Sequence, residues 1–185
     1  MPRLTGMNPD LAVAVAGADP ESAVTALYRD HALTLIRLAH IMVGNHAAAE
    51  DIVQDAFCGL YRRWEHLANK DKALGYLRSS VLNGCRSALR AAGRHRDLLI
   101  AEGYGDLAGV LDSAEARVLT SERRQAIVAA LRALPGRQRD VLVLRYFLGI
   151  DDDEIARDLE MNPSTIRSSR RRGLAALRRT LKERP

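Results

Sequence analysis

The most distinctive chemistry in the sequence lies near its C-terminus, in the stretch EMNPSTIRSSRRRG at residues 160–173. A turn-like MNPS segment leads directly into a helix-compatible segment that is rich in arginine. Small hydroxyl residues begin the outward side of that helix and guanidinium groups follow them: Ser164, Ser168, Arg171, Arg172 and Arg179. Hydroxyls at the front can reach base edges, and arginines behind them can hold phosphates. The pattern therefore favours a helix that enters the major groove of DNA.

The residues before this segment complete a helix-turn-helix pattern. DDEIARDL predicts a short first helix whose acidic N-terminus suits the helix dipole. EMNP is then the turn, and Asn162 or Ser164 can cap the second helix, with Pro163 near its start. We expect the inward sides of the two helices to consist of Ile155, Ala156, Leu159, Ile166, Leu174, Leu177 and Leu181.

Other partners for a basic amphipathic helix fit less well. A helix that lies on an anionic membrane or binds a calmodulin-like protein usually carries Trp or Phe on its apolar face, and this one carries neither. An arginine-rich RNA-binding helix remains open, although it would not need the preceding EIARDL unit.

A second polar face is predicted in the helix at about residues 73–91. Its apolar side carries Leu74, Leu77, Val81, Cys85 and Ala88, and its polar side carries Tyr76, Ser79, Asn83, Arg86, Ser87 and Arg90. Most such faces are simply solvated. This one contains no acid, and it mixes Asn, Ser, Tyr and Arg, which can reach phosphates and base edges. We therefore interpret it as a second nucleic-acid surface.

A third candidate surface lies on the preceding predicted helix, AAAEDIVQDAFCGLYRRW. Its apolar stripe consists of Val53, Ala56, Phe57, Leu60 and Trp64. At 100° per residue, Asp51 and Asp55 fall on the opposite face, with Gln54 at its edge. This pattern predicts a helix with a buried side and an acidic outward side.

These helices belong to a chain of 185 residues, long enough for one ordinary domain or two small ones. Hydrophobic residues make up 47% and aromatic residues only 4%, a composition that favours packed helices. We predict an all-α fold with two small helical domains, at 20–92 and 118–185. A flexible acidic linker at 93–117 joins them, and a disordered tail covers 1–19. The net charge of +5 suits a polyanionic partner.

Residue composition and spacing also argue against several functional classes. No run of about 18 apolar residues predicts a membrane-spanning helix. The two cysteines lack metal-ligand spacing, and we expect both to be reduced and buried, in a cytoplasmic protein. No phosphate loop, nucleophile–base pair or metal cluster is evident, and the five histidines are scattered. We therefore expect no catalytic residue, no cofactor and no metal.

Taken together and in this order, the motifs resemble the extracytoplasmic-function (ECF) sigma factors of the bacterial sigma-70 family. AEDIVQDAFCGLYRRW resembles that family's core-polymerase-binding helix, and LGYLRSSVLNGCRSALR resembles its promoter-melting helix. LRALPGRQRDVLVLRYF followed by DEIARDLEMNPSTIRSS resembles its promoter-reading domain. The resemblance covers about residues 20–182, and SSRRRGLAAL is similar to the actinobacterial branch.

The resemblance implies a mechanism and partners. The N-terminal domain would bind the clamp of the beta-prime subunit of core RNA polymerase and would capture and open the minus-ten element of promoter DNA. The C-terminal domain would read the minus-thirty-five element, and the acidic linker would thread toward the active-site cleft. The beta subunit and an anti-sigma factor are further partners that the family allows. The polymerase itself would do the chemistry.

Carried over by position, the resemblance assigns residues to each role. The polymerase-facing candidates are Asp51, Gln54 and Asp55. The minus-ten candidates are His66, Asn69, Lys70 and Lys72 in a loop, with Asn83, Arg86 and Arg90 on the following helix. The minus-thirty-five candidates are Ser164, Thr165, Arg167, Ser168, Arg171 and Arg172.

The sequence departs from the family pattern just after this last set. The family often has Arg and then an apolar residue where this chain has Ser169 and then Arg170. Arg170 projects near the inward stripe, so we expect it at the margin of the core with its guanidinium reaching outward. The main alternative to a sigma factor is a one-component helix-turn-helix regulator, in which residues 20–92 would bind a ligand or dimerise.

Overall fold

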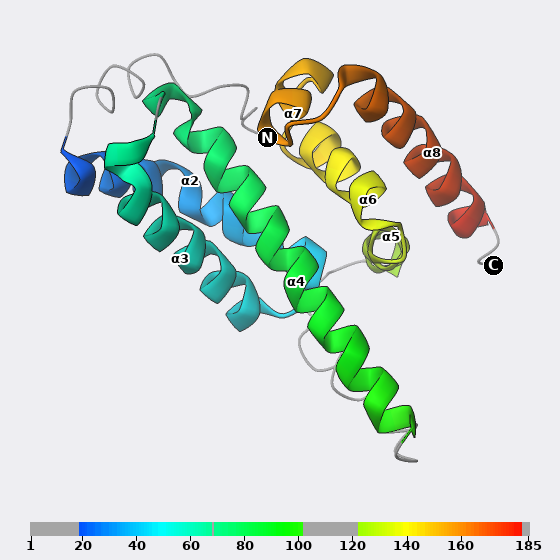
Figure 1. Ribbon diagram of the computed structural model, residues 1–185. Coiled ribbons are helices and arrows are strands. Elements are labelled where there is room, and N and C mark those ends of the chain that lie inside the picture. The colour runs from blue at the N-terminus through cyan, green and yellow to red at the C-terminus, as the bar shows by residue number, and fades with distance from the viewer. Residues whose placement is uncertain (1–18, 68, 102–121, 183–185) are drawn as a thin grey trace.

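The computed structural model describes residues 19–67, 69–101 and 122–182, and all regular structure within them is helical (Figure 1). In chain order the elements are α2 (Pro20–Val43), α3 (His46–Arg63), η1 (Trp64–His66), η2 (Lys70–Lys72), α4 (Ala73–Ala101), α5 (Glu122–Arg132), α6 (Gly136–Leu142), the π-helical segment η4 (Val143–Phe147), α7 (Asp152–Asp158) and α8 (Pro163–Lys182). The prediction of an all-α fold is confirmed.

Local capping residues fix the ends of the first two helices. The Asp19 carboxylate accepts a hydrogen bond from the Ser22 amide at 3.0 Å, and Pro20 occupies the first turn of α2. The helix ends at Gly44, whose φ of 84° is the left-handed conformation that glycine adopts most easily. Asn45 then caps α3 by accepting from the Ala48 amide at 2.8 Å. Pro20 and Gly44 therefore mark the two ends of α2.

The N-terminal unit is a core of helices α2, α3 and α4. The whole predicted stripe of α3 is buried, and Leu60 and Trp64 have no exposed surface. Burying one such large apolar side chain contributes about 1.5–3 kcal/mol, so this stripe is a main source of stability. The cysteine expectation is half wrong, because Cys85 is buried but Cys58 is exposed. Cys58 follows Phe57 on α3, so the helical turn rotates its side chain away from the core.

The C-terminal unit packs α8 across α6. Gly173 lies at this contact, where an added Cβ would lie 2.9 Å from Leu142 Cδ1. The absence of a side chain therefore allows the two helices to approach. Ile155 of α7 and Ile166 of α8 have no exposed surface and join the same core.

The two units pack directly against each other. Figure 1 shows α4 between the α2–α3 pair and the helices of the C-terminal unit. One continuous hydrophobic cluster includes Val81 of α4 and Val141 of α6. On the other side, the guanidinium of Arg132 donates to the backbone carbonyl of Ile41 at 3.0 Å, near the end of α2.

Helix α4 continues to Ala101, whereas the sequence pattern predicted that it ends at about residue 91. No proline interrupts residues 92–101, and Gly93 costs a helix only about 1 kcal/mol. Most of the predicted acidic linker, and all of the predicted tail at 1–19 except Asp19, lie outside the described residues.

Candidate nucleic-acid interface

Helices α7 and α8 form the helix-turn-helix through a short capped turn. The Asp151 carboxylate accepts from the Glu154 amide at 2.7 Å and starts α7. In the turn, Glu160 has a φ of 51°, and the Met161 amide donates to the carbonyl of Ala156 at 2.8 Å. Asn162 caps α8, because its Oδ1 accepts from the amide and the hydroxyl of Ser164. Of the two caps that the sequence allowed, Asn162 is therefore the one used.

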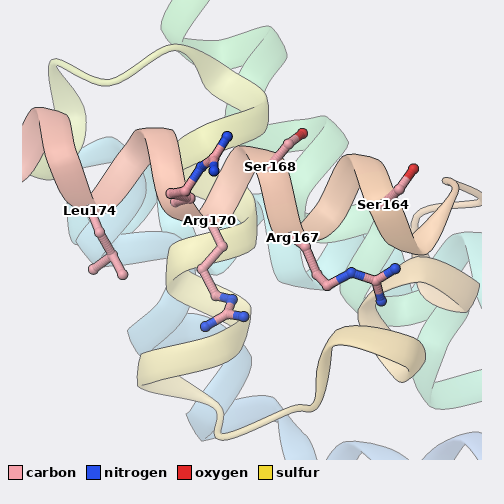
Figure 2. A pocket seen from close by; sticks show the side chains of 6 residues that line it. Ser164, Arg167, Ser168, Arg170 and Leu174 are labelled. Atoms are coloured by element: carbon pink, nitrogen blue, oxygen red, sulfur yellow. The ribbon is translucent and has the colours of Figure 1, made fainter.

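The outer surface of α8 is hollowed by a cavity of about 520 Å³. Its lining residues are Ser164, Arg167, Ser168, Arg170, Arg171 and Leu174. Figure 2 shows the side chains of Ser164 and Ser168 leaving α8 on one side of the view, and those of Arg167 and Arg170 leaving on the other. Hydroxyls and guanidiniums thus surround one shallow, positively charged hollow.

The predicted minus-thirty-five residues differ in exposure. Ser164, Arg167, Arg171 and Arg172 are exposed, and Thr165 and Ser168 are half-buried. The Ser168 hydroxyl donates to the Thr165 carbonyl at 3.0 Å and accepts from Arg172 Nη2 at 3.2 Å. Ser168 therefore holds Arg172 in place on the surface of the helix.

The residues that depart from the family pattern have distinct places on α8. Ser169 is buried, whereas Arg170 is about one-third exposed and its Nη2 lies 3.0 Å from Asp152 Oδ2 of α7. The side chain of Tyr146 and then the Asp152 carboxylate raise the pKa of Arg170. Arg170 thus lies at the margin of the core, as expected, and ties the two helices of the motif together.

The inward stripe of α8 is less buried than predicted. Ile166 is fully buried, but Leu174 and Leu177 are only half-buried, and Leu181 is 37% exposed. The prediction of an inward Leu181 is wrong. Helix α8 packs against α6 and α5 (Figure 1), and Leu181, in its last turn, stays more exposed than the leucines before it.

On α4, the predicted nucleic-acid residues fall into two groups. Asn83 and Arg90 are exposed, and Arg90 donates to the Ser87 hydroxyl at 3.0 Å. Arg86 is instead engaged within the protein, because its Nε lies 2.9 Å from Oδ2 of Asp140 on α6. The Asp140 carboxylate is only 1% exposed, and this burial raises its pKa to about 6 against the opposing effects of Arg86 and Arg139.

The sequence analysis missed Arg78, the most buried charge on α4. Its side chain is 3% exposed, and both Nη atoms donate to Oε1 of Glu154 at 2.8 Å. Its Nη1 also lies 2.7 Å from Oδ2 of Asp158. Burial raises the pKa of Asp158, and the Arg78 charge opposes that effect. No periodic signal marks Arg78, since both partners come from α7, far along the chain.

These pairs border a cleft between the two units with a volume of about 790 Å³. Its wall on the N-terminal unit includes three predicted minus-ten residues, Lys72, Asn83 and Arg86. The opposite wall includes Glu154, Arg157 and Asp158 of α7. On the face that contains no acid in the sequence, Arg86 therefore meets the carboxylate of Asp140, whereas Glu154 and Asp158 pair with Arg78, which lies outside that face.

The other minus-ten candidates lie outside this cleft. His66 and Asn69 are exposed, and the Asn69 side chain caps η2 by accepting from the Asp71 amide at 2.8 Å. The Lys70 ammonium lies 5.3 Å from the centre of the Trp64 ring, a cation–π geometry that holds the loop against the core. Of the loop candidates, only Lys72 lines the same cleft as Asn83. Arg90 and the other loop candidates lie elsewhere.

The acidic face of α3 is open. Asp51, Gln54 and Asp55 are all exposed, on the side of the helix opposite its buried stripe. In the part of the chain that the structure describes, no group of three or more His, Cys, Asp or Glu residues is arranged to hold a metal ion. Within the same residues, every helix is too short or too polar to cross a bilayer.

Comparison with known proteins identifies both halves of the chain. Residues 27–95 match the Sigma-70 region 2 family, and residues 124–177 match the Sigma-70 region 4 family. An RNA polymerase sigma-E factor from Streptomyces avermitilis is 33% identical over 150 residues, which cover 81% of this chain and 80% of that protein. The ECF RNA polymerase sigma factor SigL of Mycobacterium tuberculosis is 30% identical over 175 residues, which cover 92% and 96% of the two chains.

Two solved structures have the same fold. CnrH, in complex with the cytosolic domain of CnrY, has a TM-score of 0.70 and 20% identity, over 95% of this chain and 97% of CnrH. The sigma factor RpoE from Bartonella quintana, in complex with the anti-sigma factor NepR, has a TM-score of 0.58 and 22% identity, over 86% and 98% of the two chains. With its regions 2 and 4 in order and relatives matched along most of their length, the chain belongs to the ECF sigma factors of the sigma-70 family.

Proposed function

We propose that this sigma factor binds core RNA polymerase through the acidic face of α3 and directs initiation by contacting promoter DNA with α4 and α8. The observation that carries the proposal is the hollow on α8, where serine hydroxyls and arginines surround one outward surface. That surface lies on the second helix of a helix-turn-helix, which is the element that enters the major groove.

In the C-terminal unit, we assign base contacts to exposed residues in the first half of α8 and a phosphate contact to Arg172. Ser164, Arg167 and Arg171 are the residues for minus-thirty-five bases, because they are exposed in the first half of the helix. Arg172, held by Ser168, is placed to contact phosphate. An arginine that makes a bidentate base contact is worth about 1–3 kcal/mol of discrimination.

In the N-terminal unit, the proposal assigns strand opening to α4. Asn83 is exposed at the wall of the cleft, where an amide can contact an unpaired base. Arg90 is exposed further along the helix and can contact the strand backbone. The loop residues His66, Asn69 and Lys70 remain candidates for holding a flipped minus-ten base.

The partners follow from this assignment. We expect the beta-prime clamp and the beta subunit of core polymerase and promoter DNA to be bound, and the protein to act in the cytoplasm where they are found. The RpoE structure is a complex with an anti-sigma factor, and we propose a partner of that kind here. Sigma factors serve initiation without catalysing it, so we assign no catalytic residue. A one-component regulator would use residues 20–92 to bind a ligand or to dimerise. The match of residues 27–95 to region 2 favours a sigma factor instead.

The direct test is run-off transcription with core polymerase on a fragment from the neighbourhood of the protein's own gene. We expect a discrete transcript that requires this protein, with permanganate reactivity of promoter thymines near the start site. A protein that retains duplex binding but never supports a transcript would contradict the sigma-factor mechanism and would favour the regulator.

The docking face is tested by the double variant Asp51→Arg with Asp55→Arg. Both side chains are exposed, so each change costs folding no more than about 0.5 kcal/mol. A matched control reverses two exposed acids on α2, Glu21→Arg with Asp30→Arg. We expect only the α3 variant to stop co-purifying with core polymerase. Equal recovery of both variants would show that α3 is not the docking face.

A further inference from the structure

Arg170 lines the hollow on α8, but the proposed function assigns it no DNA contact. Its neighbours in the hollow include Ser164, Arg167 and Arg171, to which we assign base contacts. Figure 2 shows the Arg170 side chain leaving α8 on the same side as that of Arg167. The side chain is 33% exposed, so a phosphate could reach its guanidinium. By position alone, Arg170 would be a further contact to the DNA backbone.

Side chains of the neighbouring elements engage this guanidinium. Nη2 of Arg170 lies 3.0 Å from Oδ2 of Asp152, the first residue of α7, whose side chain is only 17% exposed. Tyr146 of the π-helical segment η4 and then Asp152 raise the pKa of Arg170. An apolar residue, which the family often has at this position, would need no such acid. The positive charge that departs from the family pattern is therefore matched by a negative charge within the same helix-turn-helix.

The pair contributes little to the stability of the fold. Water and salt screen an ion pair whose arginine is one-third exposed. The pair is also not bidentate, because Asp152 Oδ1 and Arg170 Nε are buried without hydrogen-bond partners among the described residues. The larger effect of Asp152 is thus on the charge that Arg170 offers to a ligand.

The pair lies where a helix-turn-helix passes the DNA backbone. In this motif the second helix enters the major groove and the first helix crosses the backbone. Asp152 begins the first helix, α7, and Arg170 projects from the second helix toward it. A free guanidinium at this junction would bind a phosphate on any sequence, because phosphates carry no sequence information. Asp152 occupies the acceptor position that such a phosphate would take.

We propose that Asp152 withholds Arg170 from DNA phosphates and thereby limits the affinity of the chain for duplexes of any sequence. This inference rests on the proposed role of α8 as the helix that enters DNA. Non-promoter sites greatly outnumber promoters in a genome, so each sequence-independent contact holds more of the protein on the wrong DNA. An acid that removes one such contact leaves more of the free chain available to core polymerase.

The expected direction separates this role from a structural one. Loss of an ion pair that merely orients α8 would weaken binding to the promoter or change the ranking of sequences. Release of Arg170 instead tightens binding to every duplex by the same factor and steepens the salt dependence, since one more phosphate is neutralised. One contact steepens the slope of log K against log salt by about 0.9, which corresponds to about eightfold in affinity between about 1 M and about 0.1 M salt.

The experiment uses the full-length chain and matched variants. Asp152→Asn keeps the shape of the side chain and removes its charge. The control Asp153→Asn removes the same charge from the next residue of α7, which is exposed. Each change is also made together with Arg170→Gln, which removes the arginine that the proposal invokes. Circular dichroism verifies that each variant retains its helices.

Fluorescence anisotropy gives the affinity for two fluorescein-labelled duplexes across a range of salt concentrations. One duplex is taken from the fragment used for run-off transcription, and the other has its sequence scrambled. At about 0.1 M salt, we expect Asp152→Asn to bind both duplexes about five- to tenfold more tightly than Asp153→Asn does, with a salt slope steeper by about one. In the Arg170→Gln background this difference between the two acids should disappear.

An equal effect of the two acid variants, or a difference that persists with Arg170→Gln, would overturn the proposal, because Arg170 would then have no part in it. Weaker binding by Asp152→Asn, or a change in the ranking of the two duplexes, would also overturn it and would make the pair an orienting contact for α8. The proposed function fails separately. If the wild type binds both duplexes equally, α8 does not read this sequence, whereas the comparison of Asp152→Asn with Asp153→Asn still decides the role of Asp152.

Discussion

The buried carboxylate of Asp140 makes the stability of this protein depend on pH in a predictable direction. Its Oδ2 lies 2.9 Å from Arg86 Nε, whereas its Oδ1 has no hydrogen-bond partner among the described residues. Burial raises the pKa of Asp140 from 3.8 to about 6, so the fold disfavours the charged form. The perturbation is Asp140→Asn, which keeps the shape of the side chain and removes its titration.

The direction in which the free energy of unfolding changes with pH follows from proton linkage. Between about pH 4 and 6 the unfolded chain has lost the Asp140 proton and the folded protein still holds it. The unfolded state therefore binds fewer protons, and this group lowers the free energy of unfolding as pH rises through that window. The two pKa values correspond to about 3 kcal/mol over the whole window. Asp140→Asn lacks this penalty, so its stability relative to the wild type should rise by that amount.

Urea titrations followed by circular dichroism, at about pH 4 and about pH 7, measure this difference. We expect the variant to gain about 2–3 kcal/mol relative to the wild type on going from the lower to the higher pH. Asp153→Asn, at an exposed carboxylate, is the control, and its difference from the wild type should change little with pH. A difference for Asp140→Asn that is the same at both pH values would refute the argument that burial raises this pKa.

Four further outcomes test the packing and capping of the helices and the DNA contact. Gly173→Ala should lower the free energy of unfolding by about 1–3 kcal/mol in urea titrations, because its Cβ would lie 2.9 Å from Leu142 Cδ1. Gly93→Ala should raise it by about 0.5–1 kcal/mol, since nothing lies within 4 Å of its Cβ, and a loss of stability there would contradict this reading. Asn162→Ala should cost about 1 kcal/mol through loss of the α8 cap, and the same titrations measure it. Arg179→Ala should weaken duplex binding about equally on promoter and scrambled sequences and lower the salt slope by about one, so a sequence-selective effect would count against a phosphate role.

The sequence alone was sufficient for the features that depend on neighbouring residues. The buried stripe of α3 and the exposed acids Asp51 and Asp55 follow from a rotation of 100° per residue, and the structure has them as predicted. The turn between α7 and α8 was also predicted, with Asn162 or Ser164 as its cap, because a capping hydrogen bond spans only a few residues; the structure uses Asn162. Family membership could likewise be inferred from the order of the motifs.

Local periodicity was insufficient at the ends of helices. Leu181 continues the inward stripe of α8, but its side chain in the last turn is 37% exposed. The end of α4 was placed too early because glycine and acid content suggested a linker, whereas the helix continues to Ala101.

Only the tertiary structure decided what surrounds the basic residues of α4. On the helical wheel Arg86 belongs to a face without acids, and Arg78 has no distinguishing position at all. In the fold, Arg78 pairs with Glu154, 76 residues away, and Arg86 pairs with the buried Asp140. A helical wheel describes one helix, whereas the charge on its surface also depends on which helix packs against it. That choice is made by the apolar contacts between the two units, and these bring the acids of α6 and α7 onto α4.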